Sequence, residues 1–167
     1  MNEIADLFHR LTFGVYVVGV ADAERRSAFT AAWVMQVSFD PLLLAISVNP
    51  GNASYPLLQA GGAFAVSVLK AGQLEVARRF GTRSGRDGDK LTGVRWRPGR
   101  SGAPILEDAL AYFECSLHGI MVSGDHELVL GRVSDGRILD RAAVPLTYGE
   151  TGDMDGSSVL YPATFSV

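Results

Sequence analysis

The chain has 167 residues, the size of one domain, and we expect residues 1–167 to fold as a single unit. Acidic residues outnumber basic residues 18 to 15, and the resulting net charge of −3 argues against a general nucleic-acid or membrane-surface binder. Hydrophobic residues at 47% and charged residues at 20% are typical of globular rather than disordered proteins.

The single cysteine, Cys115, excludes an intramolecular disulfide and fits a reducing compartment. With three histidines beside it, a structural zinc site is not expected, and we assign no metal. The N-terminus shows no basic, apolar leader, and the apolar stretch Leu42–Val48 is far shorter than the roughly 20 residues of a membrane-spanning helix. We expect a cytoplasmic protein with no membrane or nucleic-acid partner.

The first predicted element is a short helix capped by Asn2, with apolar residues at helical spacing and an end near Gly14. A β-branched strand over 15–20 and a polar hairpin loop over 22–26 follow. After a mixed segment that ends at Asp40-Pro41, the continuous apolar run Leu42–Val48 predicts a strand buried on both faces.

Turn residues over 49–52 precede Ser54, which is expected to cap a short helix with Pro56 in its first turn. A strand over 63–69 and a helix over 73–80 come next.

The segment 81–102, rich in Gly, Arg and Asp, is expected to be a long surface excursion. Residues 109–120 alternate between apolar and polar side chains, and 127–133 returns as the second strand of a hairpin. The tail after Asp140 shows no clear periodicity. About six strands with only short helices indicate a mainly β protein, an antiparallel barrel that is closed or nearly closed.

The sequence contains no dinucleotide-binding glycine motif, no phosphate-binding Walker motif and no nucleophile elbow. Cys115 lies on the apolar side of its predicted strand, where a cysteine acts as a small hydrophobic residue. One segment is locally basic, and it is either a solvated loop face or a contact surface for a phosphorylated cofactor. Its residues are Arg78, Arg79, Arg83, Arg86, Lys90, Arg95, Arg97 and Arg100.

Five short motifs follow one another along the chain. They are AFTAAWVMQVSFDP (28–41), NPGNASY (49–55), EVARRF (75–80), GAPIL with FEC (102–106 and 113–115), and GDHELVLGRV (124–133). In this order they resemble the flavin reductase-like family with the FMN-binding split-barrel fold, over roughly residues 8 to 148. The variant Trp33-Val34-Met35-Gln36 is similar to its flavoredoxin-type branch.

This resemblance implies an antiparallel split β-barrel with short flanking helices. It also implies a homodimer that binds FMN, or sometimes FAD, near the subunit interface and takes hydride from NADH or NADPH. The electrons would pass to a diffusible acceptor or to a protein such as a monooxygenase or another redox protein.

Carried onto the first motif, the resemblance implies flavin contacts from Thr30, Ala31, Ala32, Trp33, Gln36, Val37 and Ser38. The backbone of 30–33 could bond the pyrimidine edge of the ring, and two alanines would let that backbone approach. Trp33 could stack on the ring, and Gln36 and Ser38 could bond the ribityl hydroxyls. Each role has a structural alternative: core packing for the two alanines, and a core or dimer-interface position for Trp33. For Gln36 and Ser38 the alternative is a solvated strand face.

The second motif places Asn49, Asn52 and Ser54 at a turn that opens a helix, where backbone N–H groups bind phosphate. The same residues would also form an ordinary Asx turn and helix cap. Where the family has a lysine in this motif, Pro50 stands here, so the loop lacks a cation. Arg79 is the residue expected to supply one from elsewhere.

His126 is the candidate catalytic residue, since it opens a strand just after a turn and could bond the nicotinamide carboxamide or the flavin edge. A turn-stabilising histidine is the alternative. Two other functions stay open: a non-enzymatic flavoredoxin-like electron carrier, and a flavin-free barrel that binds haem through His118 or His126.

Overall fold

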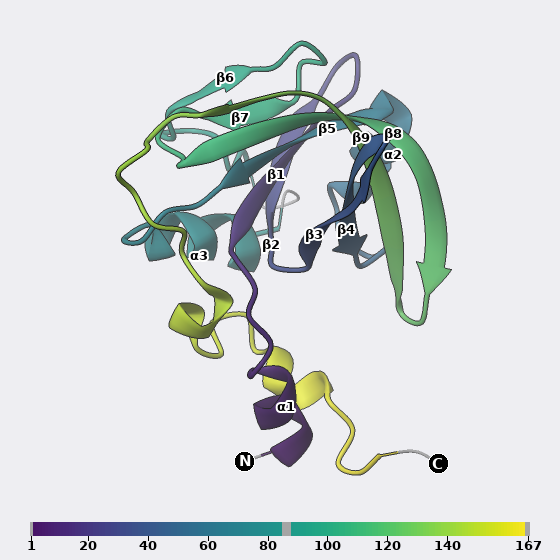
Figure 1. Ribbon diagram of the computed structural model, residues 1–167, viewed down its shortest axis with the longest axis vertical. Helices are drawn as coiled ribbons and strands as arrows, with labels where there is room; N and C mark the ends of the chain where they lie inside the picture. The colour runs from purple at the N-terminus through teal and green to yellow at the C-terminus, as the bar shows by residue number, and fades with distance from the viewer. Residues whose placement is uncertain (1, 85–87, 166–167) are drawn as a thin grey trace.

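The computed structural model describes residues 2–84 and 88–165. Its body is an antiparallel seven-stranded sheet in the order β2-β1-β5-β8-β9-β4-β3 (Figure 1). The strands are β1 (Tyr16–Ala21), β2 (Arg26–Ala31), β3 (Val34–Phe39), β4 (Leu42–Val48), β5 (Ala63–Val68), β8 (Ala111–Ser123) and β9 (His126–Ile138). A separate two-stranded sheet pairs β6 (Trp96–Pro98) with β7 (Pro104–Leu106). The prediction of a mainly β, antiparallel fold is confirmed.

The helices are short and lie around the sheet. They are α1 (Glu3–Phe8), α2 (Tyr55–Gly61), α3 (Leu74–Thr82) and the 3-10 helices η2 (Tyr148–Thr151) and η3 (Ser157–Leu160). As predicted, the Asn2 side chain caps α1 and accepts hydrogen bonds from the N–H groups of Ile4 and Ala5. No described helix has the length and apolar content needed to cross a membrane.

The seven-stranded sheet curls because its two edge strands are consecutive in the chain. Only Ala32 and Trp33 separate the end of β2 from the start of β3. The Trp33 carbonyl already accepts a hydrogen bond from Ser47 N, on β4, at 3.0 Å. The chain therefore crosses from one edge of the sheet to the other within two residues, and this forms the split barrel.

The first strand, β1, is buried on both faces. Val18 and Val20 contribute to the core cluster inside the barrel, whereas Val15 and Val17 contribute to a second cluster beneath α3. Gly19, on the same strand, must be glycine because a Cβ atom there would lie 2.0 Å from the Pro104 carbonyl oxygen on β7. This close approach packs the small sheet onto the barrel.

The long excursion predicted over 81–102 is only partly at the surface. Leu91 is buried in the cluster beneath α3, and Lys90 beside it is also buried. A hydrophobic residue within a polar loop anchors the loop to the core, so prediction from local polarity was wrong at this point. Trp96–Pro98 then forms a strand inside the same segment.

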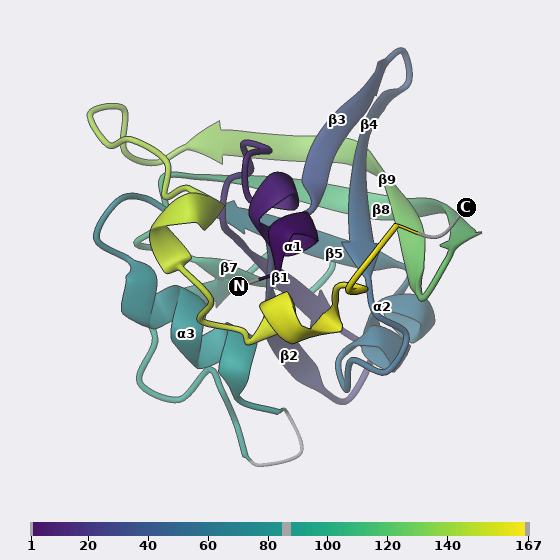
Figure 2. The ribbon, with the colours of Figure 1, turned by 90° about the horizontal axis from the view of Figure 1, so that it is seen from below.

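The two ends of the chain pack against each other beyond the barrel (Figure 1). Asn2 Nδ2 donates a hydrogen bond to the Tyr161 carbonyl at 3.1 Å, and the rings of Phe8 and Tyr161 lie 5.4 Å apart. From below, α1 and the tail lie across the open end of the barrel (Figure 2). The tail that showed no periodicity thus holds a defined position through contacts with the N-terminal helix.

Candidate functional site

Four cavities follow one another along the molecule and share walls. The aromatic cavity (180 Å³, with Trp33) and the strand-end cavity (140 Å³, with Ala32) share Tyr148. The strand-end cavity and the lysine cavity (290 Å³) share Gly81. The lysine cavity and the arginine cavity (510 Å³) share Ala53 and Lys90. This row is the candidate site.

The end of β2 forms one wall of the strand-end cavity through Thr30 and Ala32. The Thr30 hydroxyl donates a hydrogen bond to the Ala77 carbonyl on α3 at 2.7 Å, which fixes the helix against the strand. Ala31 points into the barrel core and Ala32 lines the cavity. Because the cavity-side residue is an alanine, a planar ligand can approach this backbone closely.

Trp33 and His126 are brought together by the fold, although they come from the first and last motifs. Their ring centroids lie 5.0 Å apart with an interplanar angle of 55°. The Trp33 side chain is 45% exposed, so one side of the pair faces solvent. His126 Nδ1 lies 2.8 Å from Asp125 Oδ1, and this hydrogen bond lowers the pKa of the Asp125 carboxyl. The pair offers an aromatic surface beside a polar ring.

A hydrogen bond ties the loop over 49–54 to the strand that carries His126. The buried Tyr55 hydroxyl, at the start of α2, donates to the carboxylate of Glu127 on β9. Burial first, and the neighbouring carboxylate second, raise the pKa of Tyr55 to about 12. The phenol therefore stays protonated and keeps the two segments in fixed relation.

The polar side chains of the loop mainly stabilise the loop itself. Asn49 Oδ1 accepts from Gly51 N at 2.8 Å, and Asn52 Oδ1 accepts from Ser54 N at 2.9 Å. Ser54 was expected to cap α2, but its side chain makes no capping bond and instead bonds the Ser27 hydroxyl at 2.7 Å. Of the three predicted phosphate contacts in this loop, Asn52 is the one that lines the lysine cavity.

Lys90 lines the same cavity as this loop, and sequence reasoning named it only as one of the cations of the basic segment. Its side chain is buried, with 7% of the residue exposed, and its ammonium lies 3.4 Å from the Phe80 carbonyl. Among the described residues it forms no ion pair. Burial lowers the pKa of Lys90. The sequence signals were its place in the basic segment, which was interpreted as a possible contact surface for a phosphorylated cofactor, and the apolar Leu91 next to it.

Arg79 holds the loop that carries Lys90. Its Nε donates to the Lys90 carbonyl at 2.9 Å, and a terminal nitrogen donates to the Thr92 carbonyl. These bonds direct the guanidinium at the protein backbone. Another arginine of the basic segment, Arg83, lines the lysine cavity.

The remaining predicted residues lie apart from the cavities. Gln36, Val37 and Ser38 follow Trp33 along the exposed edge strand β3, where a bulge between Gln36 and Ser38 shifts the register. In the basic segment, Arg78 pairs with Glu75, and Arg95 pairs with Glu107 and Asp108, at the surface. Arg86 lies outside the described residues.

Cys115 is buried in the barrel core, and burial, followed by the charge of Glu114, raises its pKa to about 12. A buried thiol that stays protonated is a poor nucleophile. His118 lies exposed on β8. The described residues contain no group of three or more His, Cys, Asp or Glu side chains placed to hold a metal ion.

Comparison with known proteins agrees with this arrangement. The model of a family described as the flavin reductase like domain matches residues 8–156. A high molecular weight rubredoxin from Moorella thermoacetica is 35% identical over 142 residues, which are 84% of this chain and 62% of that protein. The chain therefore spans less than two thirds of this relative.

Two solved structures are similar over nearly their whole length. The Streptomyces globisporus C-1027 NADH:FAD oxidoreductase SgcE6 has a TM-score of 0.81 and 33% identity, covering 89% of this chain and 88% of that one. BorF, the flavin reductase component of a bacterial two-component tryptophan halogenase, has a TM-score of 0.77 and 33% identity. The match covers 86% of this chain and 96% of BorF.

Proposed function

Since the chain belongs to the flavin reductase like domain family, we propose that it is an NAD(P)H:flavin oxidoreductase. It would take electrons from NADH or NADPH and pass them to a diffusible acceptor or a partner protein. The observation that carries the proposal is Lys90, a buried ammonium without an anionic partner among the described residues, in a cavity adjoining the end of β2. An ammonium in this state is suited to bind the phosphate of a flavin nucleotide.

The flavin would lie along the row of cavities. The backbone at Ala32 and the neighbouring Thr30 supply polar groups for the ring edge at the strand-end cavity. Lys90, Arg83 and Asn52 supply donors for the phosphate at the lysine cavity. Arg79 positions Lys90 by holding its loop, so we assign it an indirect role.

His126 and Trp33 would form the nicotinamide side of the site. A bound flavin supplies the redox chemistry itself. The protein then needs only to orient the nicotinamide, for which Trp33 gives an aromatic surface and the His126 ring a hydrogen-bonding edge. Asp125 orients the imidazole through its contact with Nδ1.

The direct test is the absorption spectrum of the flavin-loaded protein during anaerobic addition of NADH or NADPH. An enzyme should lose its long-wavelength flavin bands in proportion to added nicotinamide. Flavin bands that persist would instead indicate an electron carrier reduced by another protein. A Soret band in the purified protein would favour the haem alternative.

We also propose that the chain acts as a homodimer through the edge strand β3. Apolar side chains of the β3–β4 hairpin are exposed, among them Met35, Leu42 and Phe39, which is 88% exposed at its end. Figure 2 shows this hairpin projecting beyond the body of the protein. An exposed apolar edge strand favours pairing or covering by a second chain. Gln36, Val37 and Ser38 lie on this strand, so a partner there would adjoin the site.

Phe39→Asp should therefore convert the dimer into a monomer and weaken flavin binding. A carboxylate would be buried without a partner in the interface. Light scattering measures the mass, and flavin fluorescence measures the affinity. Val144→Asp, at another exposed apolar position, is the matched control and should remain dimeric. A monomeric variant with undiminished flavin affinity would show that the partner forms no wall of the site.

A further inference from the structure

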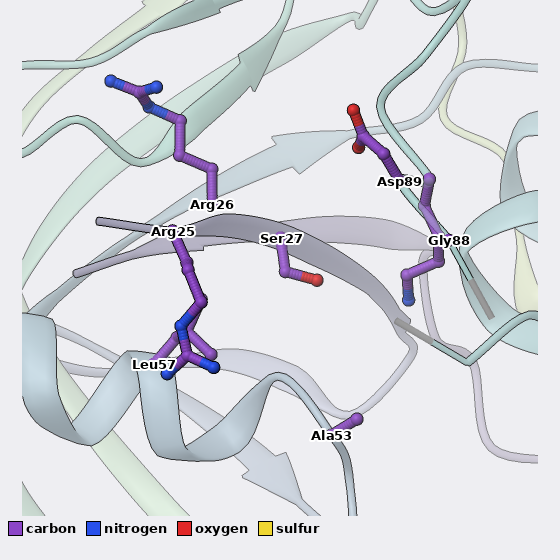
Figure 3. A pocket seen from close by; sticks show the side chains of 8 residues that line it. Arg25, Arg26, Ser27, Ala53, Leu57, Gly88 and Asp89 are labelled. Carbon is purple, nitrogen blue, oxygen red and sulfur yellow. The ribbon is translucent and has the colours of Figure 1, made fainter. Parts of the chain in front are cut away.

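The arginine cavity, of 510 Å³, is the member of the row to which the proposed function assigns no part of the flavin or the nicotinamide. Its walls come from the β1–β2 hairpin with Arg25 and Arg26, from α2 with Leu57, and from the segment that ends at Lys90. Figure 3 shows the Ser27 hydroxyl on the wall between the hairpin and the loop before α2. Pockets for small ligands have volumes of roughly 300–1,000 Å³, so this one can hold a nucleotide fragment.

The charges of this cavity favour an anion. Arg25, Lys90 and Asp89 line it with Arg26, whose guanidinium turns away from the cavity to the Gly102 carbonyl. The Asp89 carboxylate is already engaged, since Oδ1 accepts a hydrogen bond from Leu91 N at 2.8 Å. The cavity therefore has a net positive charge.

Arg25 is the arginine best placed to contact a ligand. Its side chain is 68% exposed, and among the described residues its guanidinium contacts Asp22 alone, through one terminal nitrogen at 3.3 Å. In Figure 3 its guanidinium extends toward Leu57 on α2, whereas Arg26 extends in the opposite direction. Arg26 Nε instead donates to the Gly102 carbonyl at 3.3 Å. A guanidinium with free donors and a planar face can bind a phosphate or stack on a purine.

The arginine cavity continues directly from the lysine cavity, because Ala53 and Lys90 line both. FAD is FMN extended by an adenylate group at its phosphate. If Lys90 holds the flavin phosphate, as the proposed function states, the extension from that phosphate enters the adjoining arginine cavity. We propose that this cavity is an adenylate subsite, which binds the AMP half of FAD and makes FAD the preferred flavin.

NADH and NADPH also carry an adenylate group, and it is the other source of this chemistry. Their nicotinamide must reach the flavin ring, which the proposed function places near Trp33 and His126. Trp33 lines the aromatic cavity, at the opposite end of the row from Arg25. The continuity through Lys90 favours the flavin as the source of the adenylate.

The test is a set of fluorescence titrations with FAD, FMN and AMP on the full chain and on Arg25→Gln. The parent protein should bind FAD about tenfold more tightly than FMN, and AMP should displace FAD but not FMN. Arg25→Gln should weaken FAD about five- to tenfold, because an exposed charge-assisted contact is lost. FMN affinity should change less than twofold. Arg25→Glu should weaken FAD further, since it places a carboxylate against a phosphate.

Arg141→Gln, at an exposed position away from the cavities, is the matched control and should leave both affinities unchanged. Equal affinity of the parent for FAD and FMN, or an equal loss of both in Arg25→Gln, would overturn the proposal. A raised KM for NADH or NADPH with an unchanged FAD-to-FMN ratio would also overturn it and assign the adenylate to the nicotinamide nucleotide. Failure of the parent to bind any flavin would refute the proposed function itself.

Discussion

Lys90→Met should weaken FMN binding by roughly 10- to 150-fold, equivalent to about 1.5–3 kcal/mol, because a charge-assisted hydrogen bond to phosphate is lost. Riboflavin, which has no phosphate, should bind as it does to the parent. Methionine fills a similar volume, and Lys90 is buried with the Phe80 carbonyl as its acceptor among the residues that the structure describes. The melting temperature should therefore not fall. Flavin fluorescence titrations and thermal unfolding measure these results.

Lys70→Met is the matched control, since Lys70 is the only other lysine of the chain and forms an ion pair with Asp140 at 3.0 Å. It should leave the affinity for FMN unchanged. An equal loss of FMN and riboflavin in Lys90→Met would mean that Lys90 supports the fold of the site rather than the phosphate.

The burial of Lys90 also predicts that the affinity for FMN depends on pH. Burial lowers the pKa of Lys90, and a bound phosphate would raise that pKa again by stabilising the ammonium. Above neutral pH, the preference for FMN over riboflavin should therefore decrease as the pH rises through the lowered pKa of the free protein. Lys90→Met should show no such decrease. A preference for FMN over riboflavin that stays constant up to the ordinary pKa of lysine would contradict this account.

His126→Ala should lower kcat/KM for NADH by about five- to thirtyfold, the effect of losing a hydrogen bond worth about 1–2 kcal/mol. Flavin affinity should hardly change, because His126 is assigned to the nicotinamide side with Trp33. Stopped-flow reduction of the bound flavin under anaerobic conditions measures the rate, and titration measures the affinity.

His118→Ala is the control for this variant, since His118 is exposed on β8 and makes none of the described ring contacts. It should reduce flavin at the parent rate. If His126→Ala also keeps the parent rate, the histidine serves the turn beside Asp125 rather than the reaction.

Much of the fold could be predicted because local patterns agreed with it. The continuous apolar run Leu42–Val48 predicted β4 with the bounds that the structure has, since a strand within the barrel is covered on both faces. The short polar turn around Gly124 predicted the hairpin that β8 and β9 form. The C-terminal tail could not be predicted, because its position depends on contacts with α1 rather than on its own periodicity.

The site was harder to predict than the fold. The proximity of Trp33 and His126 depends on strand order, since β4 lies between β3 and β9 and sets both registers. Lys90 and Arg79 were in the basic segment, but local sequence could not show that one faces a cavity and the other its own backbone. The burial of Leu91 and the hydrogen bonds from Arg79 hold that loop in place, and both are tertiary contacts that local sequence does not show.

The central claim is that the flavin spans the row of cavities from Ala32 to Lys90. A crystal structure of the protein with bound FMN tests it most directly. The account predicts electron density for the phosphate within hydrogen-bonding distance of the Lys90 ammonium. It also predicts the pyrimidine edge of the ring against the backbone at Ala32, and one ring face open beside Trp33 and His126. A flavin phosphate bound elsewhere, with Lys90 facing only the Phe80 carbonyl, would contradict it.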